Sequence, residues 1–85
     1  MIKEKKVGKV FAYFGKIGVA AIEVTEGEII LGEKLHFKGA TTDFEQEIES
    51  IQIDKKEVDH VEAGKSAGIK VGDKVRPGDE IYKAL

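Results

Sequence analysis

Apolar and polar residues alternate along short stretches of this chain, and glycines separate the stretches. Within residues 19–24, Ala20, Ile22 and Val24 share one parity while Glu23 takes the other. A period of two places successive side chains on opposite faces of a β-strand, so 19–24 is predicted to be a half-buried strand. The same alternation, or a short run of β-branched and aromatic residues, predicts further strands at 7–14, 29–31, 34–38, 68–71 and 80–85.

The longest strand signal covers residues 42–53 and changes phase near its middle. Phe44 and Ile48 lie on one parity, whereas Ile51 lies on the other. A one-residue slip of this kind is what a β-bulge produces, and bulges bend strands so that a small barrel can close. We therefore predict a bulge or sharp bend within 49–52.

The remaining segments indicate turns. Residues 54–65 are mostly polar, and we interpret them as a loop. A glycine followed by an acidic residue recurs at Gly32-Glu33, Gly72-Asp73 and Gly78-Asp79; glycine supplies the unusual φ of a tight turn, and Asp can bond nearby backbone. About six short strands joined by such turns predict one all-β domain over 1–85 that closes, or nearly closes, into a small barrel.

The composition narrows the class of protein. The chain has 85 residues, a net charge of −2, 35% charged residues and no cysteine, so neither a disulfide framework nor a thiolate metal site can form. Abundant Lys and Glu with few thermolabile residues indicate a thermophilic source. The N-terminal residues lack the apolar stretch of a signal peptide, and no apolar run reaches the length of a membrane span. We expect a cytoplasmic protein without membrane contact.

Two short motifs resemble ligand-binding loops but lack their context. Gly64-Lys65-Ser66 matches the end of a phosphate-binding P-loop, yet Asp59 occupies the position of its first glycine. Gly15-Lys16-Ile17-Gly18 has the spacing of an RNA-clamping loop that joins two helices, whereas this segment joins two strand patterns. We interpret both as tight turns, with Lys16 at a hairpin tip where it could touch a phosphate.

Residues that could support catalysis or bind metal are scattered. His36 lies on the polar parity of its strand and His60 lies in a polar segment, so we expect both to face solvent in structural roles. A metal site needs three or more converging ligands, and neither Ser50 nor Ser66 lies in a motif that would activate a nucleophile. The sequence predicts no metal, no cofactor and no catalytic residue, hence a binding protein and not an enzyme.

Two sets of residues are candidates for binding. Basic residues gather near both ends of the chain, and they could form one face if the first and last strands are neighbours. The candidate RNA-phosphate contacts are Lys9, Lys16, Lys70 and Arg76. A solvated charged surface is the alternative. The second set is a polar recognition corner at Thr41, Thr42 and Asp43, for which the alternative is a strand entry whose side chains bond local backbone.

Several segments resemble the second domain of elongation factor Tu and related translation GTPases. They are residues 8–11, 18–24, 26–29, 31–35 and 61–71. Residues 16–20, 39–44 and 49–53 are closer still to small stand-alone elongation-factor-like proteins, and to the C-terminal β-domain of collagenase-like peptidases. The resemblance implies a barrel of the translation-protein type over nearly the whole chain, while no segment resembles the GTPase domain.

Two functions compete on this basis. In the related GTPases this domain contacts tRNA or ribosomal RNA, so the resemblance implies a translation-factor-like binding module whose partner is tRNA, ribosomal RNA or the ribosome. The alternative is a protein-interaction module that acts with a peptidase-like or RNA-modifying partner. An exposed apolar patch including Tyr13, Phe14 or Tyr82 would support that alternative. We expect a monomer in either case.

Overall fold

Antiparallel strands account for most of the chain. The computed structural model describes residues 3–84, which form ten strands, so the all-β prediction is confirmed. The strands are β1 (Glu4–Phe14), β2 (Val19–Val24), β3 (Glu28–Ile30), β4 (Lys34–Lys38), β5 (Asp43–Glu47), β6 (Ile51–Ile53), β7 (Lys56–Val58), β8 (His60–Glu62), β9 (Ser66–Lys70) and β10 (Glu80–Ala84). Leu85, which the prediction placed in the last strand, lies outside the described residues. Among residues 3–84, no helix is long and apolar enough to cross a membrane.

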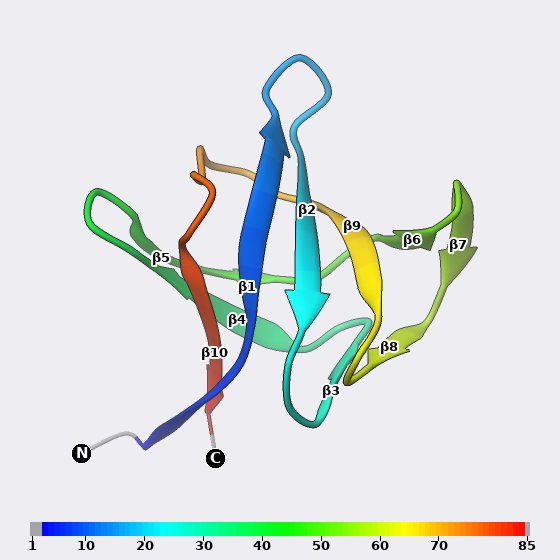
Figure 1. The fold of residues 1–85 in the computed structure, drawn as a ribbon, viewed down its shortest axis with the longest axis horizontal. Helices are drawn as coiled ribbons and strands as arrows, with labels where there is room; N and C mark the ends of the chain where they lie inside the picture. Colours follow the sequence, from blue (N-terminus) through cyan, green and yellow to red (C-terminus); the bar gives the residue numbers. More distant parts are fainter. Residues whose placement is uncertain (1–2, 85) are drawn as a thin grey trace.

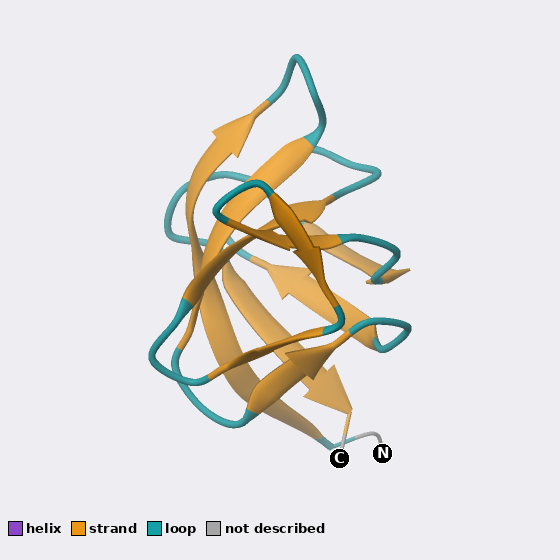
Figure 2. Ribbon diagram, turned by 90° about the vertical axis from the view of Figure 1, so that its right-hand side faces the viewer, coloured by secondary structure: helices purple, strands orange, loops and turns teal. Residues whose placement is uncertain are grey.

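Eight strands form one strongly curved sheet in the order β5-β4-β10-β1-β2-β9-β6-β7, and β3 pairs with β8 apart from it (Figure 1). The sheet wraps around one cluster of buried side chains, and its turns project at both ends (Figure 2). Within residues 3–84 the edge strands β5 and β7 form no ladder with each other. The prediction of a closed or nearly closed barrel of about six strands is therefore corrected to a curved, open sheet with more and shorter strands.

The predicted long strand over 42–53 is divided into two strands. β5 ends at Glu47, residues 48–50 leave strand geometry, and β6 begins at Ile51. The chain thereby passes from the β4 side of the sheet to the β9 side, and Ile48 and Ile51 are both buried across the bend. The phase slip therefore marks a bend, as predicted, but it separates two strands instead of bulging one.

Bulges that curve the sheet occur in β1. Its register shifts against β10 between Lys6 and Gly8, and against β2 between Val10 and Ala12. Bulges increase the local twist and bend of a strand. Gly8 lies so close to β2 that a Cβ there would stand 2.5 Å from the Glu23 carbonyl oxygen, so a larger residue could not keep this approach.

The prediction of a loop over 54–65 is wrong, because the segment contains β7 and β8. Asp54 and Lys55 both have positive φ, 52° and 66°, and Ile53 pairs with Lys56 across them. A two-residue connection with both φ values positive is a type I′ turn, whose twist matches that of an antiparallel hairpin. Each strand has three residues and a single apolar one toward the core, Val58 in β7 and Val61 in β8, so alternation of apolar residues could not reveal them.

The core follows the predicted alternation. Ala20, Ile22 and Val24 are buried on β2, and Leu35 and Phe37 are buried on β4. Phe44 on β5 packs against this core, and its ring stacks on that of Phe37 with 5.1 Å between the ring centroids. The inner faces of the central strands thus form one apolar cluster, and the outer faces and turns remain for binding.

Candidate functional site

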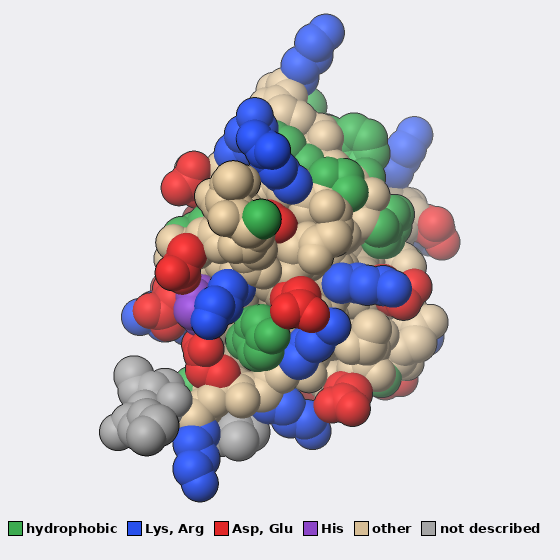
Figure 3. Space-filling view, turned by 60° about the vertical axis from the view of Figure 1, so that its left-hand side comes forward, with side chains coloured by type: hydrophobic (Ala, Val, Ile, Leu, Met, Phe, Trp, Pro, Cys, Tyr) green, Lys and Arg blue, Asp and Glu red, His purple; other side chains and the backbone are tan. Residues whose placement is uncertain are grey.

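The hairpin that joins β1 to β2 carries three large apolar side chains to the surface. Phe11, Phe14 and Ile17, which we call the hairpin cluster, have exposed fractions of 50%, 53% and 66%. The hairpin projects beyond the rest of the sheet at the top of Figure 1, and hydrophobic side chains gather close to that end in Figure 3. Covering apolar surface is favourable by about 25 cal/mol per Å², so this cluster can drive association.

Local backbone geometry fixes the hairpin tip. Gly18 has a φ of 64°, and the Ile17 N–H donates to the Phe14 carbonyl oxygen at 3.2 Å. Of the three aromatic residues expected at an exposed patch, Phe14 is exposed, whereas Tyr13 packs partly against the core. Tyr82 is half-buried and donates its hydroxyl hydrogen to Glu80 Oε1 at 2.9 Å. The sequence pattern therefore found one member of the cluster and missed Phe11 and Ile17.

A second, smaller apolar surface lies at the end of β3. Ile30 and Leu31, which we call the β3 pair, have exposed fractions of 40% and 42%. Leu31 borders two adjoining hollows of about 430 and 630 Å³, and Ile30 borders the first of them; both include Asp59 and His60 in their linings. Asp59 hydrogen-bonds His60 Nδ1 at 2.7 Å, which raises the pKa of His60 and lowers the pKa of Asp59.

The predicted recognition corner lies on the turn between β4 and β5. It borders a hollow of about 270 Å³, lined by Thr41, Thr42, Asp43, Phe44, Asp73, Lys74 and Arg76. Thr42 is buried and its carbonyl oxygen accepts from the Gly39 N–H at 2.7 Å, whereas Thr41 and Asp43 are exposed. The structure thus brings Arg76 next to the corner, a proximity that sequence spacing could not show.

The buried carboxylate of Asp79 holds this corner together. Its Oδ2 accepts from the Arg76 N–H at 2.8 Å, and a Cβ on Gly39 would overlap the same carboxylate. Gly78 before it has a φ of 96°, as the glycine-acid pattern predicted. Asp79 therefore packs the loop before β10 against the turn after β4, which leaves the Arg76 side chain exposed beside Thr41.

The other three candidate phosphate contacts lie on β1, on the hairpin turn and on β9. Lys16 lies in the hairpin turn, and Lys70 pairs with Val19 at the base of that hairpin. β1 and β10 are neighbours, as the prediction required, but Lys9 lies opposite Glu80 on β10 and Glu23 on β2. Acidic and basic side chains are interspersed across the face in Figure 3. The assignment of these four residues as phosphate contacts stays a prediction.

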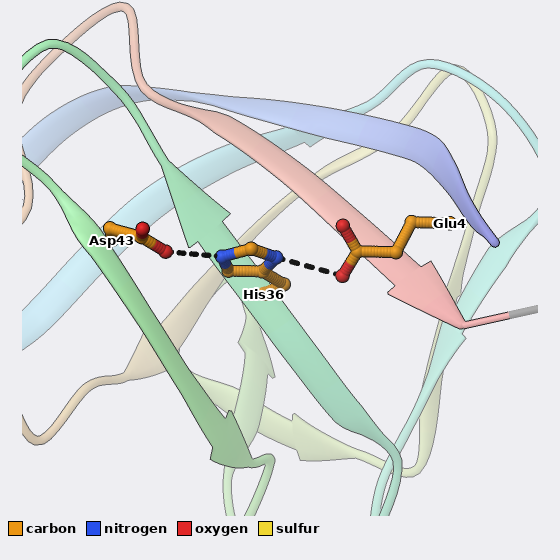
Figure 4. A network of polar contacts seen from close by, with 3 residues as sticks. All are labelled: Glu4, His36 and Asp43. Carbon is orange, nitrogen blue, oxygen red and sulfur yellow. Dashed lines mark hydrogen bonds and ion pairs between the residues drawn. The ribbon is translucent and has the colours of Figure 1, made fainter. Parts of the chain in front are cut away.

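A histidine between two carboxylates spans the outer face of the sheet (Figure 4). His36 Nδ1 lies 2.7 Å from Glu4 Oε2, and His36 Nε2 lies 2.5 Å from Asp43 Oδ1. The three residues come from β4, β1 and β5, and His36 reaches Glu4 across β10. His36 lies on the outer face, as its polar parity predicted, but only 17% of its side chain is exposed, because the sheet and the two carboxylates cover much of it.

Protonation of His36 decides how well this cluster is bonded. A protonated imidazole donates to both carboxylates, whereas a neutral imidazole has a single N–H. The hydrogen bond with Asp43, followed by that with Glu4, raises the pKa of His36 despite its burial, and the bond with His36 lowers the pKa of Asp43. Beside it, Lys6 pairs with Glu80 at 2.7 Å. We call these residues, Glu4, Lys6, His36, Asp43 and Glu80, the charged face.

Neither histidine builds a metal centre. Among residues 3–84, no three His, Cys, Asp or Glu side chains converge in a way that could hold a metal ion. The described surface offers apolar contact at the hairpin cluster and the β3 pair, and ion pairs on the charged face.

Sequence comparisons connect the chain with proteases. No protein-family model matches it. It is similar to a collagenase of Porphyromonas gingivalis, with 36% identity over 78 residues that make up 91% of this chain and 22% of that protein. It is 32% identical, over 91% of this chain, to an uncharacterized protease of Methanocaldococcus jannaschii, of which it covers 19%. The chain thus spans about a fifth of the length of the curated relatives it matches.

Solved structures show the same fold in a peptidase-derived domain. The C-terminal domain of a candidate U32 peptidase of Geobacillus thermoleovorans superposes with a TM-score of 0.86 at 24% identity, covering 93% of this chain and 99% of that one. A second structure of that domain gives a TM-score of 0.83 at 22% identity, covering 93% and 90%. At this level of identity the similarity shows a shared fold.

These findings correct the expected kinship with stand-alone elongation-factor-like proteins and the expected role with tRNA, ribosomal RNA or the ribosome. The collagenase and the archaeal relative are both proteases, and the similarity to the C-terminal β-domain of collagenase-like peptidases is the part of the resemblance that they support. The residues that resemble the elongation-factor domain lie mostly in strands and turns. Such residues determine the geometry of a small β-domain and do not identify its ligand.

Proposed function

We propose that this chain is a non-catalytic interaction module that acts with the catalytic region of a collagenase-like peptidase. The observation that carries the proposal is the 36% identity over 91% of the chain to a collagenase of which it covers 22%. A module that corresponds to a fifth of such a protein leaves the remaining four fifths to supply the catalytic machinery. Its own contribution is then to bind and position.

The hairpin cluster supports this function as the docking surface. Phe11, Phe14 and Ile17 lie on one projecting hairpin, and each has half or more of its surface exposed. Aromatic and large aliphatic side chains at the centre of an interface contribute most of the binding energy when a partner covers them. Lys16 in the same turn adds a charge that can lie at the polar rim of such an interface.

The direct experiment is calorimetric titration of this chain into the catalytic region of a collagenase-like peptidase from the source organism, prepared without its own segment similar to this chain. Binding is expected for the unaltered chain. The double variant Phe14→Ser/Ile17→Ser is expected to bind at least about tenfold more weakly, because two apolar anchors are lost. Its thermal unfolding should stay nearly unchanged, because both side chains are exposed.

The β3 pair provides the matched control. Ile30→Ser/Leu31→Ser makes the same kind of double change in a smaller exposed apolar surface on another part of the molecule and should bind like the unaltered chain. Absence of any binding by the unaltered chain would refute the proposed function. Loss of binding in the β3 variant with retention in the hairpin variant would move the docking surface to β3.

A further inference from the structure

One side chain, not a strand ladder, bridges β5 and the end of β9. The Gln46 amide donates from Nε2 to the Lys70 carbonyl oxygen at 2.9 Å and accepts at Oε1 from the Gly72 N–H at 2.8 Å. In the part of the chain that the structure describes, β5 has a ladder with β4 alone. We call the gap that Gln46 bridges the seam.

The backbone beyond β9 presents the pattern of a strand edge to this seam. Lys70 and Gly72 flank Val71, whose own N–H points the other way, to the Gly18 carbonyl oxygen at 2.8 Å. In a parallel ladder, one residue of the neighbouring strand donates to a carbonyl oxygen and accepts from the N–H two residues further along. The Gln46 amide makes this pair of bonds, so it occupies the place that one residue of an added strand would take.

The directions of the strands allow an added strand to bond with both sides of the seam. Five antiparallel ladders, β5-β4, β4-β10, β10-β1, β1-β2 and β2-β9, separate β5 from β9, so these two strands run in opposite directions. A strand parallel to residues 70–72 is then antiparallel to β5. Within the described residues, β5 has no ladder on the side of the seam, so a strand added there would break none. Beyond Glu47 the chain is held by Ile48, which bonds Gly32 and Glu33, and by Ile51, which pairs with Ile69.

The charge at the seam selects the ligand. A hollow of about 260 Å³ lies there, lined by Gln46, Glu47, Glu49, Lys70, Val71 and Gly72. Two exposed carboxylates face one ammonium group in this lining, and Glu45 adds a third carboxylate on β5. Opposite charges on neighbouring strands attract and like charges repel, so a basic strand is favoured over an acidic one.

We propose that the seam binds an extended peptide segment with lysine or arginine at alternate positions, which displaces the Gln46 amide and adds as a strand between β5 and residues 70–72. Main-chain hydrogen bonds supply the affinity, and Glu47 and Glu49 supply the preference for basic side chains. This binding goes beyond the docking function and rests on the seam alone, since the hairpin cluster takes no part in it.

The test uses the whole chain and a fluorescein-labelled peptide of about seven residues in which Lys and Val alternate. Fluorescence anisotropy should show saturable binding, and amide NMR signals of residues 46–47 and 70–72 should shift. A peptide with Glu in place of Lys, and one N-methylated at alternate residues, should each bind at least about tenfold more weakly, because one lacks the charge match and the other lacks ladder donors.

Variants at Gln46 separate ligand binding from a structural role. Gln46→Ala removes the competing amide and should tighten peptide binding severalfold, and Gln46→Glu, which places a carboxylate against the Lys70 carbonyl oxygen, should do the same if Gln46→Ala fails to fold. Gln52→Ala, on the exposed side of β6, is the matched control and should leave binding unchanged.

Three outcomes would overturn the proposal. They are equal binding of the N-methylated peptide, NMR shifts confined to the other sheet edge at β7, or Gln46 variants that lose stability without gaining affinity. The double variant Phe14→Ser/Ile17→Ser should keep full peptide binding, so a failure of the docking function and a failure at the seam give different results.

Discussion

One strand, β1, contributes to two surfaces of opposite chemistry. Its first residues belong to the charged face, where Glu4 bonds His36 and Lys6 pairs with Glu80. Its last residues belong to the hairpin cluster, whose three side chains are each half or more exposed. The charged face pairs its polar groups with residues of the same sheet, whereas the hairpin leaves apolar surface in contact with water.

This difference supports the proposed docking surface. A partner that covered the charged face would have to desolvate ion pairs that are already made, and the Coulombic gain seldom exceeds that penalty. A partner that covered the hairpin cluster would remove apolar surface from water, which is favourable without further compensation. We therefore propose the hairpin cluster, and not the charged face, as the surface that a partner would use.

The largest expected effect separates buried from exposed phenylalanine. Phe37 is fully buried under the charged face and stacks on Phe44, so Phe37→Ala should lower the free energy of unfolding by about 3–5 kcal/mol. Phe11→Ala, in the hairpin cluster, should change it by no more than about 0.5 kcal/mol. Urea unfolding followed by circular dichroism measures both. Equal losses would mean that the hairpin cluster belongs to the core.

A smaller effect is expected from removal of the histidine between the two carboxylates. His36→Gln keeps polar contact but cannot carry a charge, so it should lower the free energy of unfolding by about 1 kcal/mol at pH 6. His60→Gln, whose histidine is more exposed, is the matched control and should have a smaller effect. Peptidase binding should be unaffected by either change. A His36 variant that unfolds normally but no longer binds would place the docking surface on the charged face.

The smallest effect is a pH dependence that originates at the same residue. Because the folded-state pKa of His36 is raised above its usual value of 6.5, its contribution to stability is complete below that value and is lost as the pH rises through the folded pKa. The lowered pKa of Asp43 acts on the other side, since its contribution is lost as the pH falls below its usual 3.8 and through the folded value.

The measurement is the free energy of unfolding of the unaltered chain and of His36→Gln as a function of pH; the quantity compared is the difference between the two. The difference should be greatest between about pH 4.5 and 6.5 and should shrink at higher pH. The His60→Gln control retains His36, so its stability should still show the fall with rising pH that originates at His36. A difference that grows with rising pH would contradict the arrangement of protonated His36 between Glu4 and Asp43.

Much of the fold could be predicted from the sequence because the central strands are half-buried. Alternation placed β2 at its observed bounds and found the inward side chains of β4, Leu35 and Phe37. Alternation failed for β7 and β8, because each has a single apolar residue toward the core, Val58 and Val61, and the type I′ turn at Asp54 and Lys55 is a backbone conformation that these residue types do not signal.

The candidate site was less predictable, because it depends on which strands are neighbours. His36 and Asp43 are close in sequence, but Glu4 reaches His36 only through the order of β1, β10 and β4. Likewise, nothing in the spacing of Phe11 and Ile17 shows that the hairpin extends past the core and leaves them exposed. Residue types indicated the candidates, and the pairing of distant strands decided which of them act together.

Amide hydrogen exchange in the complex tests the central claim most directly. The chain is measured alone and then bound to the catalytic region of the collagenase-like peptidase. Docking through the hairpin predicts slower exchange on binding for the amides of residues 11–18, with little change in β4, β5 and β10 under the charged face. Protection confined to β4, β5 and β10, with exchange at 11–18 unchanged, would contradict the account.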